Sequence, residues 1–378
     1  MLLVHKIKLK PNNIQSTYFK KSCGVARFAY NWALEEWGKQ YKAGKRPSEI
    51  SLRKELNAIK PNLYPWMLEA TKVAPQQAIK NLGQAFKRFF QKQSKYPKFK
   101  KKGINDSFRA DNGPAKAGAD AVTIKAKKIK LPKVGWIKLS EKLRFVGQIK
   151  SVVVSRCANK WYAAISVDTN ELPHVRKNHG IVGVDLGISH LATMSDGTEV
   201  KGPKAHKSLL SRLKRLSRRL SKKKKGSNSY MKARQRLSCL HARVSNIRKD
   251  AIHKLTTSLV LDNIKIGIED LNVSGMQKNH CLARSVMDQG FYEFRRQLTY
   301  KADWYGTEVF IADRWYPSTK LCNVCKTKNT ELTLKDRFWQ CQVCNTEHHR
   351  DINAAINLEA LCKSTEQNEV NTVSSTEI

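Results

Sequence analysis

Four cysteines near the end of the chain constrain its folding more than any other feature. They form two Cys-x-x-Cys pairs separated by fifteen residues, namely Cys322 with Cys325 and Cys341 with Cys344. This spacing is typical of a zinc ribbon, in which two short knuckles close a tetrahedron of thiolates around one ion. Because four thiolates leave no open coordination position, we expect one structural Zn²⁺ ion in a ribbon over residues 315–347.

The remaining cysteines and the nearby histidines leave two alternatives. Four free buried thiols would need no metal, but the other five cysteines are scattered along the chain, as in a protein of a reducing cytosol with one metal site. His348 and His349 follow the last cysteine of the group closely and could be mistaken for ligands. We do not expect them to bind the ion, since the four sulfurs already complete the tetrahedron.

The charge of the chain indicates a polyanionic partner. The 378 residues include 71 Lys and Arg against 31 Asp and Glu, a formal net charge of +40. Solubility requires far less than this. With 40% hydrophobic residues the chain can build buried cores, so we expect two or three domains and no wholly disordered basic protein. No stretch approaches 18 uncharged apolar residues, and we therefore expect neither secretion nor a membrane span.

Changes in hydrophobic period divide the chain into two halves. Residues 1–10 and the stretch 161–167 alternate apolar with other side chains and predict strands. Between them, apolar residues recur every three to four positions at about 15–45 and 72–93, which predicts helices. The first 175 residues are therefore predicted to form a β-barrel or sandwich with a helical insertion at about 15–95.

The second half has the alternating pattern of an α/β domain. Apolar runs predict strands at 181–187, 191–194, near 199, at 264–268 and at 307–312. Leucine stripes predict a helical hairpin with its turn at 226–228, followed by helices at 290–305 and 351–361. Residues 363–378 contain almost no core-forming side chain, and we expect them to be disordered.

Three acidic residues occupy positions that suit metal-dependent phosphodiester chemistry. Asp185 and Glu269 each end a predicted strand, two residues after a glycine on the same face, and Asp351 begins the last helix. A position without a side chain leaves room beside the acid for a metal ion or a phosphate backbone. Together the acids could hold two Mg²⁺ ions, as in nucleases of the RNase H type. Singly, each could instead be a turn former, a solvated surface acid or a helix cap.

Two tracts without acids are candidates for contacts with phosphates. Residues 201–249 contain eighteen Lys or Arg and no Asp or Glu, and residues 86–102 interleave aromatic side chains with eight basic ones. Aromatic and cationic residues together suit RNA or single-stranded nucleic acid, although Phe86, Phe89 and Phe90 could equally form helix core. The candidate nucleic-acid-binding residues are Lys98, Lys100, Lys101, Lys102, Arg109, Arg218, Arg219, Lys222, Lys223, Lys224 and Lys225.

Several short segments resemble the signature of the TnpB (OrfB) family of bacterial insertion sequences. They are Gly183 to Gly187, Ile268 to Asn272, the run from Ser318 to Cys325, and Arg350 to Ala355, with Tyr96 to Lys102 and Asp106 to Arg109 resembling the family's middle segment. The resemblance covers nearly the whole chain except the tail. Three positions depart from the family pattern: His349 stands where an Asp is frequent, and Lys326 and Asn345 stand where a Gly often follows the cysteine.

The resemblance implies an RNA-guided DNA endonuclease of a bacterium or archaeon, acting in the cytoplasm on the nucleoid. Its fold would be a wedge-type β-barrel with a helical recognition insert over residues 1–175, followed by a RuvC-like nuclease domain over 180–314 and 348–362 that contains the zinc ribbon. The family's catalytic triad falls on Asp185, Glu269 and Asp351. Its partners would be a guide RNA from the transposon end and a target DNA cut beside a short transposon-associated motif, with no membrane.

Two alternative functions remain compatible with the sequence. A nuclease-inactive, RNA-guided DNA-binding repressor is disfavoured by the intact set of three acids. A guide-independent resolvase or transposase with the RNase H fold would use the same acids without RNA. A transposase of the single-strand type is disfavoured because none of the ten histidines forms a His-x-His pair.

Overall fold

The computed structural model describes residues 1–112, 122–170, 172, 180–333 and 335–374. The chain divides into two compact units, Met1–Pro173 and His174–Ile378. None of the described helices combines the length and the apolar character that a bilayer-spanning segment needs.

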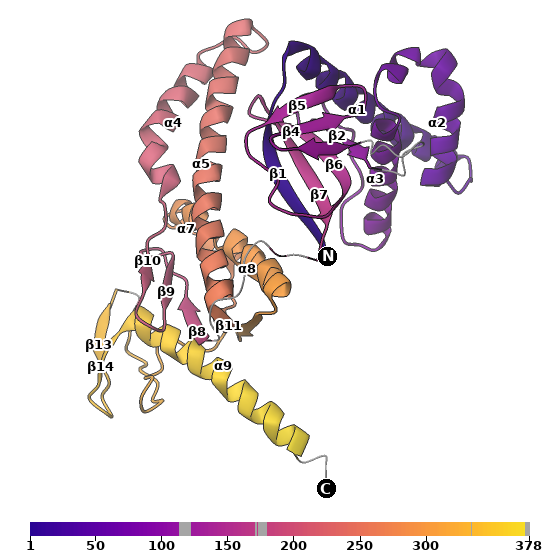
Figure 1. The fold of residues 1–378 in the computed structure, drawn as a ribbon. Helices are drawn as coiled ribbons and strands as arrows, with labels where there is room; N and C mark the ends of the chain where they lie inside the picture. The colour runs from indigo at the N-terminus through magenta and orange to yellow at the C-terminus, as the bar shows by residue number, and fades with distance from the viewer. Residues whose placement is uncertain (113–121, 171, 173–179, 334, 375–378) are drawn as a thin grey trace. The chain divides into compact units, whose positions relative to one another are not determined.

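The first unit is built on a seven-stranded antiparallel sheet (Figure 1). At its centre lies β1 (Leu2–Lys10), between β7 (Lys160–Asp168) and β5 (Gly135–Leu139). Beyond β7 follow β6 (Gln148–Cys157) and β2 (Ser107–Asp111), and beyond β5 follow β4 (Lys128–Leu131) and β3 (Thr123–Lys125). The pairings of the described residues run from β2 to β3 without joining these two edges. The predicted strands at 1–10 and 161–167 are confirmed.

Helices inserted between β1 and β2 cover one face of this sheet (Figure 1). The inserted helices are α1 (Asn13–Lys42), α2 (Glu49–Leu63), a short 3-10 helix (Pro65–Glu69) and α3 (Val73–Phe90). Helices α1 and α3 pack on the sheet, and α2 packs on these two helices. Phe19 of α1 packs against Phe108 of β2 and Trp161 of β7, so the helices and the sheet share one core. The two predicted helices are confirmed as α1 and α3. The sequence did not predict α2, which buries only Leu52 and Leu56 and therefore has a weak apolar stripe.

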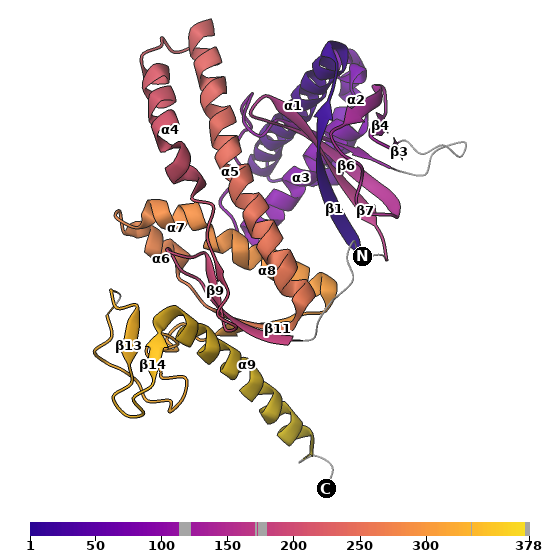
Figure 2. The same ribbon diagram turned by 60° about the vertical axis from the view of Figure 1, so that its left-hand side comes forward.

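The second unit is a five-stranded sheet with helices on both faces (Figure 2). Its strands are β8 (Gly180–Asp185), β9 (Ala192–Met194), β10 (Glu199–Val200), β11 (Asn263–Glu269) and β12 (Glu308–Ala312). The first three form an antiparallel meander, and β11 and β12 continue the sheet on the other side of β8 as parallel strands. This is the predicted strand content, and the α/β architecture agrees with an RNase H-like fold.

Two long helices form the predicted hairpin of the second unit. They are α4 (Ala205–Ser221) and α5 (Asn228–Asp262), and Leu213 of α4 packs with Leu240 and Val244 of α5. The end of α5 and helix α8 (Phe291–Tyr305) cover one face of the sheet. The short helices α6 (Val273–Lys278) and α7 (Ala283–Gln289) connect β11 to α8.

A pair of glycines seats the last helix, α9 (Arg350–Ser374), on the opposite face of the sheet. Gly183 of β8 and Gly267 of β11 are direct neighbours across the two strands. A Cβ atom at Gly183 would lie 1.8 Å from the carbonyl oxygen of Ala355, and one at Gly267 would lie 2.6 Å from Cys362 Sγ. The helix therefore fills the space that the glycines leave, and the prediction that a metal ion or a phosphate uses this space is wrong.

Helix α9 extends beyond the apolar pattern that predicts it. The pattern ends at Leu361, whereas the helix continues to Ser374. Residues 363–374, which we expected to be disordered, are thus helical in the structure, since no glycine or proline interrupts the segment. Residues 375–378 of the same prediction lie outside the described residues.

Candidate active site and metal centre

The packing of α9 brings Asp351 to the ends of two strands. Asp185 ends β8 two residues after Gly183, and Glu269 ends β11 in the same way. Asp351 precedes Ala355, which lies over Gly183, by one helical turn. The helix rises about 6 Å from Ala355 back to Asp351, and the strand extends about 6.6 Å from Gly183 to Asp185. Asp351 therefore reaches the same end of the sheet as Asp185 and Glu269.

The three carboxylates are close enough to affect one another's protonation. The side chains of Asp185 and Asp351 are almost completely buried, with 7% and 6% exposure of the residues. Burial, followed by the charges of Glu269 and Asp351, raises the pKa of Asp185 well above its usual value. Burial also raises the pKa of Glu269. A buried group of like charges is unfavourable by itself, and it favours the binding of cations.

Two arginines hold Asp351. Arg337 Nη1 donates to Asp351 Oδ2 over 2.6 Å, and Arg350 donates to Asp351 Oδ1 from Nε and Nη2 over 3.0 and 2.9 Å. The pairing of Phe338 with His349 in the ribbon places the two arginines opposite each other, and the Arg350 N–H donates to the Arg337 carbonyl over 2.8 Å. The sequence did not predict the contact of Arg337, because this contact depends on the register of two strands.

The two neighbouring acids at the end of β11 have different partners. Glu269 accepts a hydrogen bond from the hydroxyl of the buried Ser318. Asp270 instead forms ion pairs with Arg295 and Arg314. Glu269 is therefore the acid that faces Asp185, as strand parity predicted. Sequence reasoning missed the role of Ser318, although this residue begins one of the segments that resemble the family.

The four cysteines of the ribbon converge on one point. The sulfur atoms of Cys322 and Cys344 lie 3.6 Å apart, and those of Cys325 and Cys341 lie 3.5 Å apart. All four lie within 4.8 Å of one another, whereas the three carboxylates of the described chain form no cluster of this tightness. Zinc bonds of about 2.3 Å place tetrahedral sulfurs roughly 3.8 Å apart. The thiols therefore fit a zinc ion.

The two knuckles share one backbone geometry. The N–H groups of Lys326 and Asn345 donate to the carbonyls of Cys322 and Cys341 over 3.0 and 2.9 Å. Both donors have positive φ angles, 62° and 56°, in the left-handed region that favours glycine. Lys326 and Asn345 therefore adopt the backbone conformation for which the family often has a glycine. The knuckle geometry is preserved although the residue type differs.

His348 contacts the cysteine cluster without being one of its four members. It lies on β14 (Glu347–His349), which pairs with β13 (Phe338–Gln340), and its Nε2 atom is 3.1 Å from Cys322 Sγ. Burial lowers the pKa of His348, so its neutral ring can donate an N–H to a thiolate. His349 contacts Phe338 instead. Both observations agree with a ligand set of four sulfurs.

Two asparagines of α9 hold the ribbon. Asn353 Nδ2 donates to the Leu321 carbonyl over 2.8 Å, and Asn357 Nδ2 donates to the Ser318 and Leu321 carbonyls over 2.9 and 2.6 Å. Both asparagines are buried. Because the ribbon segment also supplies Ser318 and Arg337 to the acids, its folding is physically linked to the geometry of the acid cluster.

The predicted basic residues of the second unit lie together at the tip of the helical hairpin. Lys222 to Lys225 are exposed between α4 and α5, and Arg218 and Arg219 occupy the last turn of α4. No acid of the described chain forms an ion pair with any of the six. They therefore present uncompensated charge to the solvent.

The predicted basic residues of the first unit differ in their availability. Lys98, Lys101 and Lys102 are exposed. Lys100 Nζ lies 4.0 Å from the ring centroid of Tyr30. Arg109 forms an ion pair with Asp111, two residues further along the same strand, β2. The sequence left open whether the phenylalanines of this tract form helix core or an exposed surface. In the structure Phe86 is buried in the core and Phe90 is exposed.

Sequence profiles of known families match most of the chain. The OrfB_IS605 profile, described as "Probable transposase", matches residues 164–280, and a Cas12f1-like TNB domain matches residues 291–358. A helix-turn-helix domain profile matches residues 1–46, where the structure contains strand β1 and the single long helix α1.

Relatives and solved structures agree with these profiles. "Putative RNA-guided DNA endonuclease InsQ" of Escherichia coli (strain K12) is 33% identical over 95% of this chain and 92% of its own length. "Putative RNA-guided DNA endonuclease" of Streptomyces pristinaespiralis is 34% identical over 94% of this chain and 88% of its own. A Cas12f1-sgRNA-target DNA complex shares the fold, with a TM-score of 0.58 and 16% identity over 92% of this chain and 83% of the other. The chain therefore belongs to the OrfB (TnpB) family of IS605-type insertion sequences.

Proposed function

We propose that this chain is an RNA-guided DNA endonuclease that hydrolyses phosphodiester bonds of a target DNA beside a short transposon-associated motif. The observation that carries the proposal is the meeting of three acids, the buried Asp185 and Asp351 and the half-buried Glu269, at one end of the sheet of the second unit. The net charge of +40 supports polyanionic partners, and the names of the two relatives support this activity.

Asp185, Glu269 and Asp351 would hold two Mg²⁺ ions. Carboxylate oxygens are ligands that Mg²⁺ prefers, and the repulsion of Asp185 by the charges of Glu269 and Asp351 fits a dicationic site. The ions would supply an activated water and stabilise the leaving oxygen of the phosphodiester. In this site Ser318 orients one oxygen of Glu269, and the two arginines hold the carboxylate of Asp351 in place.

The four cysteines would hold one structural Zn²⁺ ion. Their thiolates fill a tetrahedron and leave no position for a reacting molecule. The role of this module is then to fold the segment that delivers Ser318 and Arg337 to the acids.

The remaining parts of the chain would hold the nucleic acids. In this proposal residues 1–175 form the wedge domain with its recognition insert, and residues 180–314 and 348–362 form the nuclease domain. The exposed lysines of residues 98–102 and of the hairpin tip would contact phosphates of the guide RNA and the target DNA.

Plasmid cleavage tests the proposed function. Purified protein with Mg²⁺ is incubated with a plasmid, with and without the RNA encoded across the 3′ end of its own gene. We expect cutting only with the RNA, at the site that the RNA matches. Equal and sequence-independent cutting in both tubes would support the guide-independent resolvase. RNA-directed binding without any cutting would support the repressor.

A further inference from the structure

The open face of the sheet in the first unit carries a row of lysines that none of the contacts described above uses. Lys125 of β3 is the direct partner of Lys128 of β4, and Lys128 is the partner of Lys138 of β5. Lys138 is in turn the partner of Lys10 of β1. Four lysines therefore stand side by side across four adjacent strands, and we call them the lysine row.

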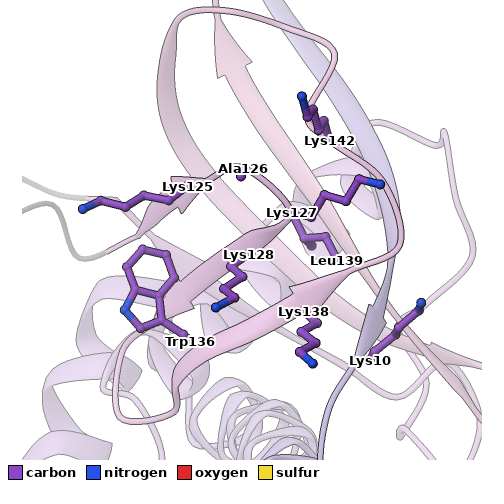
Figure 3. Close-up of a pocket in the computed structure, with 9 residues that line it drawn as sticks. All are labelled: Lys10, Lys125, Ala126, Lys127, Lys128, Trp136, Lys138, Leu139 and Lys142. Atoms are coloured by element: carbon purple, nitrogen blue, oxygen red, sulfur yellow. The ribbon is translucent and has the colours of Figure 1, made fainter.

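The lysine row lines a cavity together with one aromatic ring. The cavity measures about 860 Å³ and is lined also by Lys127, Lys142 and Trp136, and none of the described side chains that line it is acidic (Figure 3). Trp136 is 40% exposed and lies on the same side of the β4–β5 hairpin as Lys128 and Lys138 (Figure 3). Gln15 at the start of α1 donates a hydrogen bond to the Trp136 carbonyl over 3.0 Å and fixes the strand at this point.

Such a row is unfavourable in the protein alone. Adjacent strands are about 4.8 Å apart, and like charges directly opposite each other destabilise a sheet. No acid of the described chain forms an ion pair with any member of the row. Lysines interspersed with other side chains are enough to keep the surface of a sheet soluble. The direct alignment of four lysines therefore points to a partner that neutralises their charge.

We propose that the lysine row and Trp136 bind a single-stranded segment of the guide RNA. The lysines would follow consecutive phosphates, and an unpaired base would stack on the indole ring. Stacking requires a base that has left its helix, which excludes a target duplex as the occupant. The permanent repulsion within the row favours a resident polyanion over a transiently displaced DNA strand. The identification of this occupant as the guide rests on the proposed function.

Two variants separate the phosphate contacts from the stacking contact. The triple variant Lys125→Gln/Lys128→Gln/Lys138→Gln should bind the guide RNA more weakly, and its affinity should depend less on salt, with a slope lowered by about 2 for three contacts to a single strand. Trp136→Ala should lose on the order of tenfold in affinity with an unchanged salt slope, and Trp136→Phe should restore most of it. The measurement is RNA binding by filter retention at four salt concentrations.

A matched control removes the same charge elsewhere in the chain. Lys328→Gln/Lys335→Gln/Lys363→Gln changes three exposed lysines outside the segments proposed to hold the nucleic acids. An equal change of affinity and slope in this control would overturn the site, since net charge alone would then explain the loss. A melting experiment on RNA-free protein adds an independent readout: relief of repulsion should raise the Tm of the row variant, and an unchanged or lower Tm would contradict the argument.

The same assays distinguish failure of this site from failure of the proposed function. If the row variant binds RNA and is guided by it like the wild type, the site is wrong and the function stands. If the wild type binds no RNA in any form, both are wrong. Loss of affinity for single-stranded DNA alone, with RNA binding intact, would overturn the assignment of the occupant to RNA.

Discussion

Among single residues, Asp351 has the most partners of the three acids. Three N–H groups from Arg337 and Arg350 reach its two oxygens, while burial and its neighbours raise the pKa of Asp185. The positions of the acids were predictable because strand parity and the start of a helix are local properties of the sequence. The position of Arg337 was not, since it reaches Asp351 only when β13 pairs with β14.

Replacing each acid tests its assignment. Asp185→Ala, Glu269→Ala and Asp351→Ala should each keep the affinity for guide and target close to the wild-type value. Cleavage should fall by about a thousandfold or more, because a lost ligand removes charge stabilisation in the transition state and no phosphate contact in the ground state. Gel-shift and cleavage assays measure the two quantities. Asp270→Asn, which alters an ion-paired neighbour, is the control, and wild-type cutting by Asp351→Ala would exclude the assignment.

Glu293 of α8 should make stability depend on pH. The Arg296 guanidinium lowers the pKa of Glu293 from 4.5 to about 2. A carboxyl with a depressed pKa in the folded state stabilises the fold above its unfolded pKa, and this contribution disappears as the pH falls from about 4.5 through 2. Glu293→Gln should therefore lower the Tm slightly at pH 7 and less at pH 3, with a contribution below about 1 kcal/mol because Arg296 is half exposed. An equal difference at both pH values would contradict the linkage.

Among the elements, the contact between α9 and the sheet depends on two residues without side chains. The sequence predicted both strands and the helix, but it did not predict that the glycines serve the helix, because this depends on which helix covers which face. Gly183→Ala places a methyl group against the Ala355 carbonyl, which is backbone and cannot turn aside.

We expect Gly183→Ala to displace α9 and destabilise the second unit by on the order of 3 kcal/mol. Cleavage should fall as well, since Asp351 moves with the helix. Chemical denaturation and the cleavage assay measure these effects. The control is Gly38→Ala in α1, where no described atom outside the adjoining backbone of the helix lies within 4 Å of the added methyl group and where alanine should stabilise the helix by up to about 1 kcal/mol. A fully stable and active Gly183→Ala protein would show that α9 packs differently.

The folding of the zinc ribbon should depend on its bound metal ion. Cys341→Ser should release zinc and unfold the ribbon, because a bound tetrathiolate ion contributes on the order of 10 kcal/mol to the folding of its own module. Metal analysis of protein purified without chelator should find about one zinc per chain in the wild type. Cys157→Ser, an exposed cysteine far from the cluster in sequence, should keep its zinc. An absence of zinc from the wild type would assign another role to the four thiols.

For the whole molecule, the sequence predicted two halves with different fold classes, a β unit with inserted helices and an α/β unit. It did not predict which residues from distant parts of the chain form a common surface within each unit. The lysine row illustrates the reason. Lys10 and Lys138 come from distant parts of the chain, and only the register of β1 with β5 makes them neighbours. The hairpin tip, by contrast, was predictable because Lys222 to Lys225 are consecutive in the sequence.

A net charge of +40 exceeds what one duplex site needs, and the acid-free tracts 70–105 and 201–249 belong to different units. We therefore expect two polyanions, of which one is a resident RNA. Protein purified at low salt should carry strong absorbance at 260 nm, and high salt should remove it because each phosphate contact releases counterions. The stripped protein should bind DNA weakly and without sequence preference. Returning the RNA should restore sequence choice through base pairing, with mismatches nearest the protein-read motif the most damaging. Stripped protein that still selects a DNA sequence would show that the protein itself reads the target.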